Sequence, residues 1–340
     1  MTIRRGLPPL AAGLLALSLT LAACGSDDDG DDANDAGGSG DFAAVTIEHA
    51  FGSTEIAEEP QRVVTWGWGA ADAAVALGVT PVAIPTQSYG GDENGLLPWI
   101  AEELEEQGAE TPTMLSETEE PPYEEILKAE PDLILAPYSG ITEDQYKKLS
   151  EIADTVAYPE TAWATPWRDV ITITGQALGK QDEAEQVIAD IEGEVAEAAE
   201  EHPEFAGKTI AAVWDAGDFY VYTEADPRVE FLTDLGFEVA PSVSENDTGE
   251  STFYYTISYE ETDKITSDVL LAYHDTADIE ETFMAADSTR SMQQFKDETI
   301  ANVVGADVIA SVSPPTALSL SYSLDDFVAA LAEAAANVEE

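Results

Sequence analysis

The sequence predicts an α/β protein with two lobes, each built on a mostly parallel central sheet, and one long helix joining them. Three observations predict this class. Short apolar segments alternate with helical segments along most of the chain, as in sheets whose strands are connected by helices. The arrangement of the first half returns in the second half. One long Glu- and Ala-rich helical pattern, at residues 181–202, lies between the halves.

The first half is expected to contain a strand, turn, helix, strand, helix and strand at 62–66, 67–69, 70–77, 81–84, 123–129 and 132–136. Gly78 supplies the residue that ends the helix at 70–77. Glu130 and Pro131 close the helix at 123–129, because proline cannot continue a helix. These elements form the smallest repeating unit of an α/β sheet.

The second half is expected to contain a strand, strand, helix, strand, helix and strand at 208–214, 220–223, 228–235, 236–240, 258–265 and 268–274. Between the halves, Val187, Ile191 and Val195 recur at four-residue spacing and predict one buried face of a long helix. At about 1.5 Å per residue such a helix spans roughly the width of a domain.

The N-terminus predicts export and lipid attachment. Arg4 and Arg5 precede an apolar stretch at 10–22, which is too short for a membrane span of ~20 residues and fits a signal peptide. The sequence around Cys24, the only cysteine, resembles the lipobox of bacterial lipoproteins. We therefore expect a signal peptide at 1–23, lipid on Cys24 and an acidic flexible tether at 24–41. An ordinary signal with an incidental Cys is the alternative, and Sec or Tat export stays open.

The charge balance excludes one class of partner. The chain has 69 acidic and 13 basic residues and a net charge of −56. It therefore offers no basic surface for nucleic acid or anionic lipid. The same excess is typical of salt-adapted proteins. Some 300 residues remain after the tether, which is about two domains of ordinary size.

Four passages resemble the ferric-siderophore and cobalamin binding proteins of ABC importers: "RVVTWGWGAADAAVALGVTPVAI", "YEEILKAEPDLILA", "ALGKQDEAEQVIADIEGEVAEAAEEHPEFAGKTIAAVW" and "PPTALSLSYSLDDFVAALAEA". The resemblance implies two Rossmann-like lobes that hold one ligand between them. The expected organisation is an N-terminal lobe at 42–180, a linker helix at 181–203 and a C-terminal lobe at 204–340. It further implies a ferric siderophore and ABC permease subunits as partners, an extracytoplasmic, lipid-anchored location at the cell membrane, and a monomer.

Other chemistries fit the residues less well. The glycine turn at 67–69 has Asp72 where a dinucleotide fingerprint needs its third glycine. His49, His202 and His274 lie on separate elements and cannot converge on a metal. Neither a nucleophile elbow nor a Cys–His pair is present. We therefore expect no enzyme activity, no catalytic residues, no cofactor and no protein metal site, with iron carried only as a chelate. A haem or corrinoid binding protein, or an adhesive or sensory surface lipoprotein, remains an alternative.

The expected ligand site consists of aromatic residues at the carboxyl ends of strands, where open parallel sheets bind ligands, and of residues in nearby loops. Its members are Trp66, Trp68, Tyr89, Tyr138, Trp163, Trp214, Tyr273, His274 and Arg290. Flat rings pack well on a bulky organic chelate without needing charge. Arg290, and less directly Arg168, are the arginines expected at this cleft. Because so few cations are expected at the cleft, the site favours a neutral or cationic hydroxamate chelate over a tris-catecholate of charge about −3, whose charge would stay uncompensated.

The resemblance also implies one acidic residue on each lobe that engages arginines of the permease. The matching positions are Glu124 and Glu260, each expected in the first turn of a helix.

Overall fold

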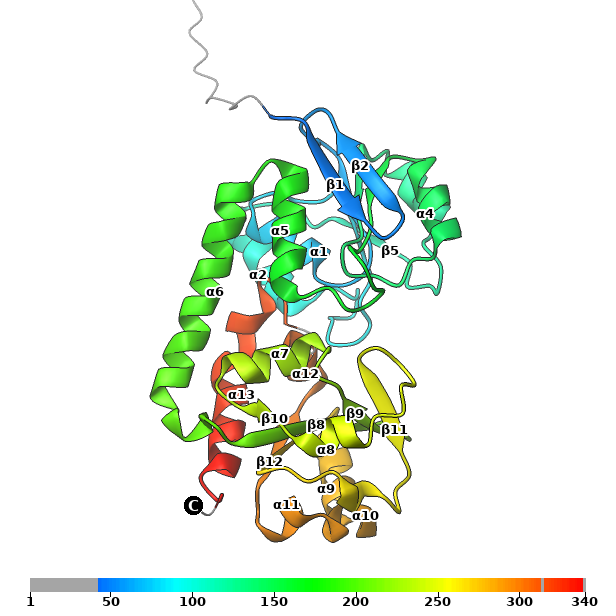
Figure 1. Ribbon diagram of the computed structural model, residues 1–340. Helices are drawn as coiled ribbons and strands as arrows, with labels where there is room; N and C mark the ends of the chain where they lie inside the picture. Colours follow the sequence, from blue (N-terminus) through cyan, green and yellow to red (C-terminus); the bar gives the residue numbers. More distant parts are fainter. Residues whose placement is uncertain (1–41, 313–314, 339–340) are drawn as a thin grey trace, which may run out of the picture. The chain divides into compact units, whose positions relative to one another are not determined.

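The computed structural model describes residues 42–312 and 315–338 (Figure 1).

The N-terminal lobe is built on a five-stranded parallel sheet. The strands of this sheet are β3 (Val63–Thr65), β4 (Ala83–Pro85), β5 (Thr113–Leu115), β6 (Leu133–Leu135) and β7 (Asp154–Val156). They lie in the order β5-β4-β3-β6-β7, and every neighbouring pair is parallel. The chain leaves β3 first toward β4 and later returns to β6 on its other side, so the sheet has a switch point between β3 and β6.

Apolar strands and helices on both faces form the core of this lobe. Every residue of β3 and β6 is buried, as expected for central parallel strands that are covered on both faces. The helices are α1 (Ala70–Ala76), α2 (Pro98–Gln107), α3 (Tyr123–Lys128), α4 (Glu143–Ser150) and α5 (Trp167–Leu178). The lobe begins with an antiparallel hairpin of β1 (Val45–His49) and β2 (Gly52–Ile56). The hairpin buries Ile47 and Ile56 in the core.

The long helix α6 (Gln181–Glu201) joins the two lobes and confirms the expected linker helix. It follows α5 directly and leads through the 3-10 turn η1 (Pro203–Phe205) into the first strand of the second sheet (Figure 1). Ile191 and Val195 are buried and Val187 is half-buried, so the predicted apolar face packs on the protein.

The C-terminal lobe contains a mixed six-stranded sheet. Its strands are β8 (Thr209–Asp215), β9 (Phe219–Tyr222), β10 (Glu238–Val239), β11 (Tyr254–Ile257), β12 (Val269–His274) and β13 (Ile300–Val304). The order is β11-β9-β8-β12-β13, with β10 also paired to β8. β8, β10, β12 and β13 are parallel, whereas β9 is antiparallel to both β8 and β11. Only residues 216–218 separate β8 from β9, and a parallel pair needs a crossover of a dozen residues or more.

Seven helices and one 3-10 turn accompany this second sheet within the described residues, and all but α13 are short. They are α7 (Pro227–Asp234), α8 (Pro241–Glu245), α9 (Ala277–Ala285), α10 (Asp287–Ser291), α11 (Gln293–Lys296), α12 (Ala306–Val312), α13 (Ser319–Ala335) and the 3-10 turn η2 (Thr262–Lys264). The α/β class with two lobes and one joining helix is therefore confirmed, with more antiparallel pairing in the second lobe than the alternating pattern suggested.

The prediction of a helix at 258–265 is wrong. Only the 3-10 turn η2 forms there. The hydroxyl of Thr262 donates 3.0 Å to the backbone oxygen of Ser288 and lies 3.4 Å from that of Tyr259. This bond ties the turn to α10. The backbone N–H groups of Glu261, Lys264 and Ile265 each bond the residue three positions earlier, which is the pattern of tight turns rather than of an α-helix. Glu260 consequently lies in an exposed turn rather than in a helix.

The C-terminal segment packs against the first lobe as well as the second. The hydroxyl of Thr316 donates to the buried carboxylate of Asp72 in α1. The ring of Tyr322, in α13, lies 5.5 Å from that of Trp99 in α2. The described residues from Phe42 onward form one compact unit, so the lobe boundaries at 180 and 204 stay a prediction.

Candidate ligand-binding site

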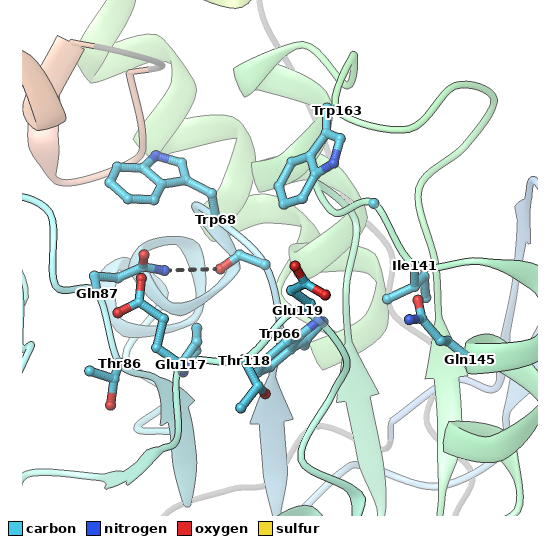
Figure 2. A pocket seen from close by; sticks show the side chains of 13 residues that line it. Trp66, Trp68, Thr86, Gln87, Glu117, Thr118, Glu119, Ile141, Gln145 and Trp163 are labelled. Carbon is cyan, nitrogen blue, oxygen red and sulfur yellow. Dashed lines mark hydrogen bonds between the residues drawn. The ribbon is translucent and has the colours of Figure 1, made fainter. Parts of the chain in front are cut away.

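A cavity of about 380 Å³ lies at the carboxyl ends of the N-terminal sheet. The segments that follow all five strands line it: residues 66–68 after β3, 85–87 at the end of β4, 117–119 after β5, residues 140, 141 and 145 after β6, and Trp163 after β7. Figure 2 shows the rings of Trp66, Trp68 and Trp163 around it. The cavity therefore occupies the position at which open parallel sheets bind ligands.

Gly67 allows the loop after β3 to lie against the loop after β6. Its φ is +94°, and a Cβ there would be only 2.3 Å from the backbone oxygen of Tyr138. The next backbone N–H, of Trp68, donates 3.0 Å to that same oxygen. The glycine turn seen in the sequence thus holds Trp66 and Trp68 at the switch point of the sheet.

Trp163 is held in place by a second close approach. Its backbone has φ +58°, which is uncommon for a residue other than glycine. A Cβ on Gly140 would lie 2.1 Å from Nε1 of Trp163, so only glycine leaves room for the ring. The ring packs edge-to-face on the buried Tyr138, with centroids 5.6 Å apart. Although 39 % exposed, Trp163 therefore has a defined orientation at the cavity wall.

A second cavity of about 370 Å³ is lined by residues of both lobes. The N-terminal lobe contributes Trp68 and Tyr89. The C-terminal lobe contributes Trp214, Ala216, Tyr220, Tyr222, Arg228, Phe253 and Tyr254. Trp68 lines both cavities, so the two adjoin at its ring. Six rings other than Trp68 line this second cavity, which makes its wall mainly aromatic.

Arg228 is the cation of the second cavity, and sequence reasoning missed it. It lies in the first turn of α7 and is 8 % exposed. Its Nε lies 2.7 Å from Oδ1 of the buried Asp226, an ion pair whose angle falls outside hydrogen-bond geometry. Its guanidinium carbon lies 3.8 Å above the ring of Tyr222. The signal for it was present: an Asp-Pro-Arg sequence opens a helix directly after an aromatic strand.

Arg228 is part of a buried polar cluster with Tyr222, Asp226 and Tyr273. Burial raises the pKa of Tyr222 to about 12 and raises the pKa of Tyr273. Burial also raises the pKa of Asp226, while Arg228 opposes that shift. Neither the Tyr273 hydroxyl nor Oδ2 of Asp226 has a hydrogen-bond partner within the described protein. The tyrosines therefore stay neutral and present hydroxyl groups, with Arg228 as a permanent positive charge.

The first cavity has the opposite electrostatic character. The charged residues that line it are Glu117 and Glu119, both in the exposed loop after β5. In Figure 2 the carboxylate of Glu119 lies between the rings of Trp66 and Trp163, and that of Glu117 lies beside Gln87. Gln87 and Gln145 supply neutral amides, and Gln87 donates 3.3 Å to the backbone oxygen of Gly67. The first cavity thus favours an uncharged or cationic group.

The structure brings most of the expected residues together. Trp66, Trp68, Tyr89, Trp163 and Trp214 line one cavity or the other. Tyr138 is buried behind Trp163.

Tyr273 and His274 are consecutive in β12, so their side chains point to opposite faces of the sheet. Tyr273 joins the Arg228 side, with its ring 6.2 Å from that of Tyr222. His274 lies on the other face, where its Nε2 pairs with Asn302 over 2.8 Å and its ring contacts Phe283. Burial lowers the pKa of His274, which keeps the imidazole neutral.

The structure does not place Arg290 or Arg168 at either cavity. Arg290 is exposed on α10, which packs against η2 and α11 (Figure 1). The prediction placed Arg290 in a loop that reaches the cleft, whereas the segment around it forms the consecutive helices α9, α10 and α11. Arg168 lies in α5, where carboxylates surround it.

The remaining expected positions divide into exposed and undescribed ones. Glu124 is exposed in the first turn of α3, as expected, and Glu260 is exposed in the turn before η2. Cys24, the signal peptide and the tether lie outside the described residues. Within 42–312 and 315–338, the helices include none that is both long and apolar enough to span a bilayer. In the same ranges, His, Cys, Asp and Glu form no group of three that could hold a metal ion.

Two α/β lobes, a joining helix and an aromatic cavity lined by both lobes define a ligand-binding protein of the two-lobe class. Residues 63–306 match the periplasmic binding protein family, and the chain belongs to that family. The resemblance found in the sequence is thereby confirmed.

Three relatives illustrate the likeness. The probable siderophore-binding lipoprotein YfiY of Bacillus subtilis is 30% identical over 197 residues, which is 57% of this chain and 57% of that protein. The match thus spans little more than half of that relative's length. PiaA of Streptococcus pneumoniae, solved in complex with ferrichrome, is 33% identical with a TM-score of 0.77, covering 86% of this chain and 99% of that one. SirA of Staphylococcus aureus, complexed with staphyloferrin B, shares the fold at 24% identity and a TM-score of 0.68, with 84% and 98% covered.

Proposed function

We propose that this protein is a lipid-anchored extracytoplasmic receptor that binds a ferric siderophore and delivers it to an ABC permease. The observation that carries the proposal is the pair of adjoining cavities, which meet at Trp68 and are lined by aromatic rings from both lobes. Such walls suit a bulky organic chelate, whose outer surface is largely apolar. Membership of the periplasmic binding protein family supports a transport role over an enzymatic one.

The charges of the site support a neutral or cationic hydroxamate chelate. Arg228 lines the second cavity and can donate to the oxygens around the iron. Hydrogen bonds from a charged guanidinium are stronger than those from a neutral donor. Glu117 and Glu119 disfavour an anionic ligand in the adjoining cavity. A tris-catecholate complex of charge about −3 would leave most of its charge uncompensated there. Ferrichrome, which PiaA binds in its crystal structure, is a hydroxamate chelate and supports the same class.

Tryptophan fluorescence tests the ligand class directly, because Trp66, Trp68, Trp163 and Trp214 line the cavities. We expect a ferric trihydroxamate to quench the emission at sub-micromolar concentration, and the iron-free hydroxamate to quench it much less. Quenching by haem or cobalamin instead would favour those ligands. Indifference to all of these chelates would leave an adhesive or sensory lipoprotein.

Anchoring and delivery complete the proposal. Cys24 would carry the lipid, so Cys24→Ser should release the protein into the medium and abolish palmitate labelling. Retention of that variant at the membrane would contradict the anchor. Glu124 and Glu260, one on each lobe and both exposed, would engage the permease. The iron would be carried as the chelate, without a metal site in the protein.

A further inference from the structure

Arg168 joins three helices through one guanidinium group. It lies in the first turn of α5, and its Nε donates to Glu192 of α6 over 2.7 Å. Its Nη1 donates to Glu230 and its Nη2 to Asp234, each over 2.9 Å, and both carboxylates belong to α7. The N-terminal lobe is thus tied to the joining helix and to the C-terminal lobe at a single residue.

The helix α7 presents opposite faces to Arg168 and to the ligand site. Successive residues of a helix are about 100° apart, so Glu230 and Asp234 share one face. Arg228 precedes Glu230 by two residues and therefore points about 200° away from it. The structure shows this division, since Arg228 lines the second cavity while Glu230 and Asp234 bind Arg168.

The sequence of α7 does not compensate the charges of its own two carboxylates. The helix has only eight residues, and a helix this short is not stable without tertiary contacts. Glu230 and Asp234 repel each other at the i, i+4 spacing. Asp234 also ends the helix, where a negative charge is unfavourable and no basic residue in the last turn offsets it. Arg168 compensates both carboxylates at once, with its side chain only 27% exposed.

We propose that Arg168 is a positioning residue for ligand binding: it clamps α7 to α5 and thereby holds the guanidinium of Arg228 at the wall of the second cavity. The inference rests on the proposed function only in taking Arg228 as a ligand contact. The bond to Glu192 is not part of the clamp, because it joins α5 to α6 and does not reach α7.

The three partners of Arg168 allow this positioning role to be separated from a general effect on stability. We expect Arg168→Met to weaken chelate binding by about threefold to thirtyfold in the fluorescence titration. The double variant Glu230→Gln/Asp234→Asn removes only the ties to α7 and should weaken binding to a similar degree. Glu192→Gln removes only the tie to α6 and should bind within about twofold of the wild type. Lys147→Met, which breaks an exposed ion pair with Glu143 within α4, is the matched control.

A double-mutant cycle tests the link to Arg228. In an Arg228→Met background, Arg168→Met should cause no further loss of affinity beyond about twofold, because the group it positions is gone. Full and additive losses would show that Arg168 acts by another route. Normal binding by both the Arg168→Met and the Glu230→Gln/Asp234→Asn variants, with Arg228→Met impaired, would overturn the inference and leave the proposed function standing.

A measurement without ligand separates the two proposals. Amide hydrogen exchange at Arg228 and Val229 should be faster in Arg168→Met than in Lys147→Met. If the wild-type protein bound no chelate, the proposed function would fail, and unchanged exchange in α7 would then overturn the clamp as well.

Discussion

The hydroxyl of Tyr89 donates a 2.8 Å hydrogen bond to Oδ1 of Asp275, across 186 positions of sequence. Tyr89 lies in the loop after β4 of the N-terminal lobe, and Asp275 directly follows β12 of the C-terminal lobe. The Tyr89 ring also lies 5.7 Å from that of Trp214. Burial and the bond to Asp275 raise the pKa of Tyr89, so the hydroxyl stays protonated and donates at neutral pH. One side chain thus links the lobes and lines the second cavity.

Two substitutions at Tyr89 should separate these roles. Tyr89→Phe keeps the ring and loses the hydrogen bond, so we expect the free energy of unfolding to fall by about 0.5–1.5 kcal/mol with chelate affinity little changed. Tyr89→Ala also removes the ring and should weaken affinity by about tenfold or more. Urea unfolding and fluorescence titration measure the two quantities. Equal affinities for the two variants would show that the ring does not contact the ligand.

Gly140→Ala should displace Trp163 from the first cavity. The new methyl group would lie 2.1 Å from Nε1 of Trp163, so the ring must move. We expect a shift in tryptophan emission and a loss of affinity of about tenfold. Gly193→Ala, in the middle of α6 with open space around the new methyl, is the control and should stabilise the fold by up to about 1 kcal/mol. An unshifted emission spectrum in Gly140→Ala would contradict the packing of this pair.

Asp72 should make stability depend on pH. Burial raises the pKa of its carboxyl, while hydrogen bonds from Thr316 and Trp99 oppose the shift. An acid whose folded-state pKa lies above its unfolded value stabilises the fold in acid and loses that contribution as pH rises through the folded-state pKa. Asp72→Asn is neutral throughout, so its free energy of unfolding relative to the wild type should rise with pH above the unfolded-state pKa of about 4. A difference that is flat or falls with pH would show that Asp72 is ionised at little cost.

The double variant Glu117→Gln/Glu119→Gln should relax discrimination against anionic chelates. Removing two charges beside the first cavity should improve binding of a ferric tris-catecholate by about fivefold at low salt, and much less at high salt. Binding of a neutral ferric hydroxamate should not change. Glu185→Gln/Glu197→Gln, an equal charge change on exposed positions of α6, is the control. Equal gains from both pairs would assign the effect to net charge alone.

Glu124→Ala combined with Glu260→Ala should abolish uptake while leaving chelate binding intact. Both carboxylates are exposed, and each has an exposed apolar neighbour, Leu127 and Tyr259 respectively. Neither lines a cavity. Radioactive iron uptake in cells and fluorescence titration of the purified variant measure the two properties. Normal uptake would remove these residues from the permease interface.

Local patterns in the sequence were sufficient for the class of fold. The strands at 62–66 and 132–136 were recognisable because central parallel strands are apolar throughout, and the structure has β3 and β6 there. The helix at 181–202 was recognisable because a buried stripe at helical spacing needs no tertiary information. The helix at 258–265 failed because the chain there forms a 3-10 turn that the hydroxyl of Thr262 ties to Ser288 of α10, a contact that the local pattern does not show.

The aromatic part of the candidate site also followed from sequence, because the carboxyl ends of parallel strands meet at one edge of a sheet. Trp66, Trp68 and Trp214 could therefore be grouped before their distances were known. The positions of the arginines could not be predicted in this way. Arginines occur in helices and loops whose direction depends on packing, so only the tertiary structure directed Arg228 into the cavity, Arg168 onto three carboxylates and Arg290 outward. Strand periodicity and parallel pairing are local properties of the chain, whereas the placement of a long charged side chain is decided by the elements that pack around it.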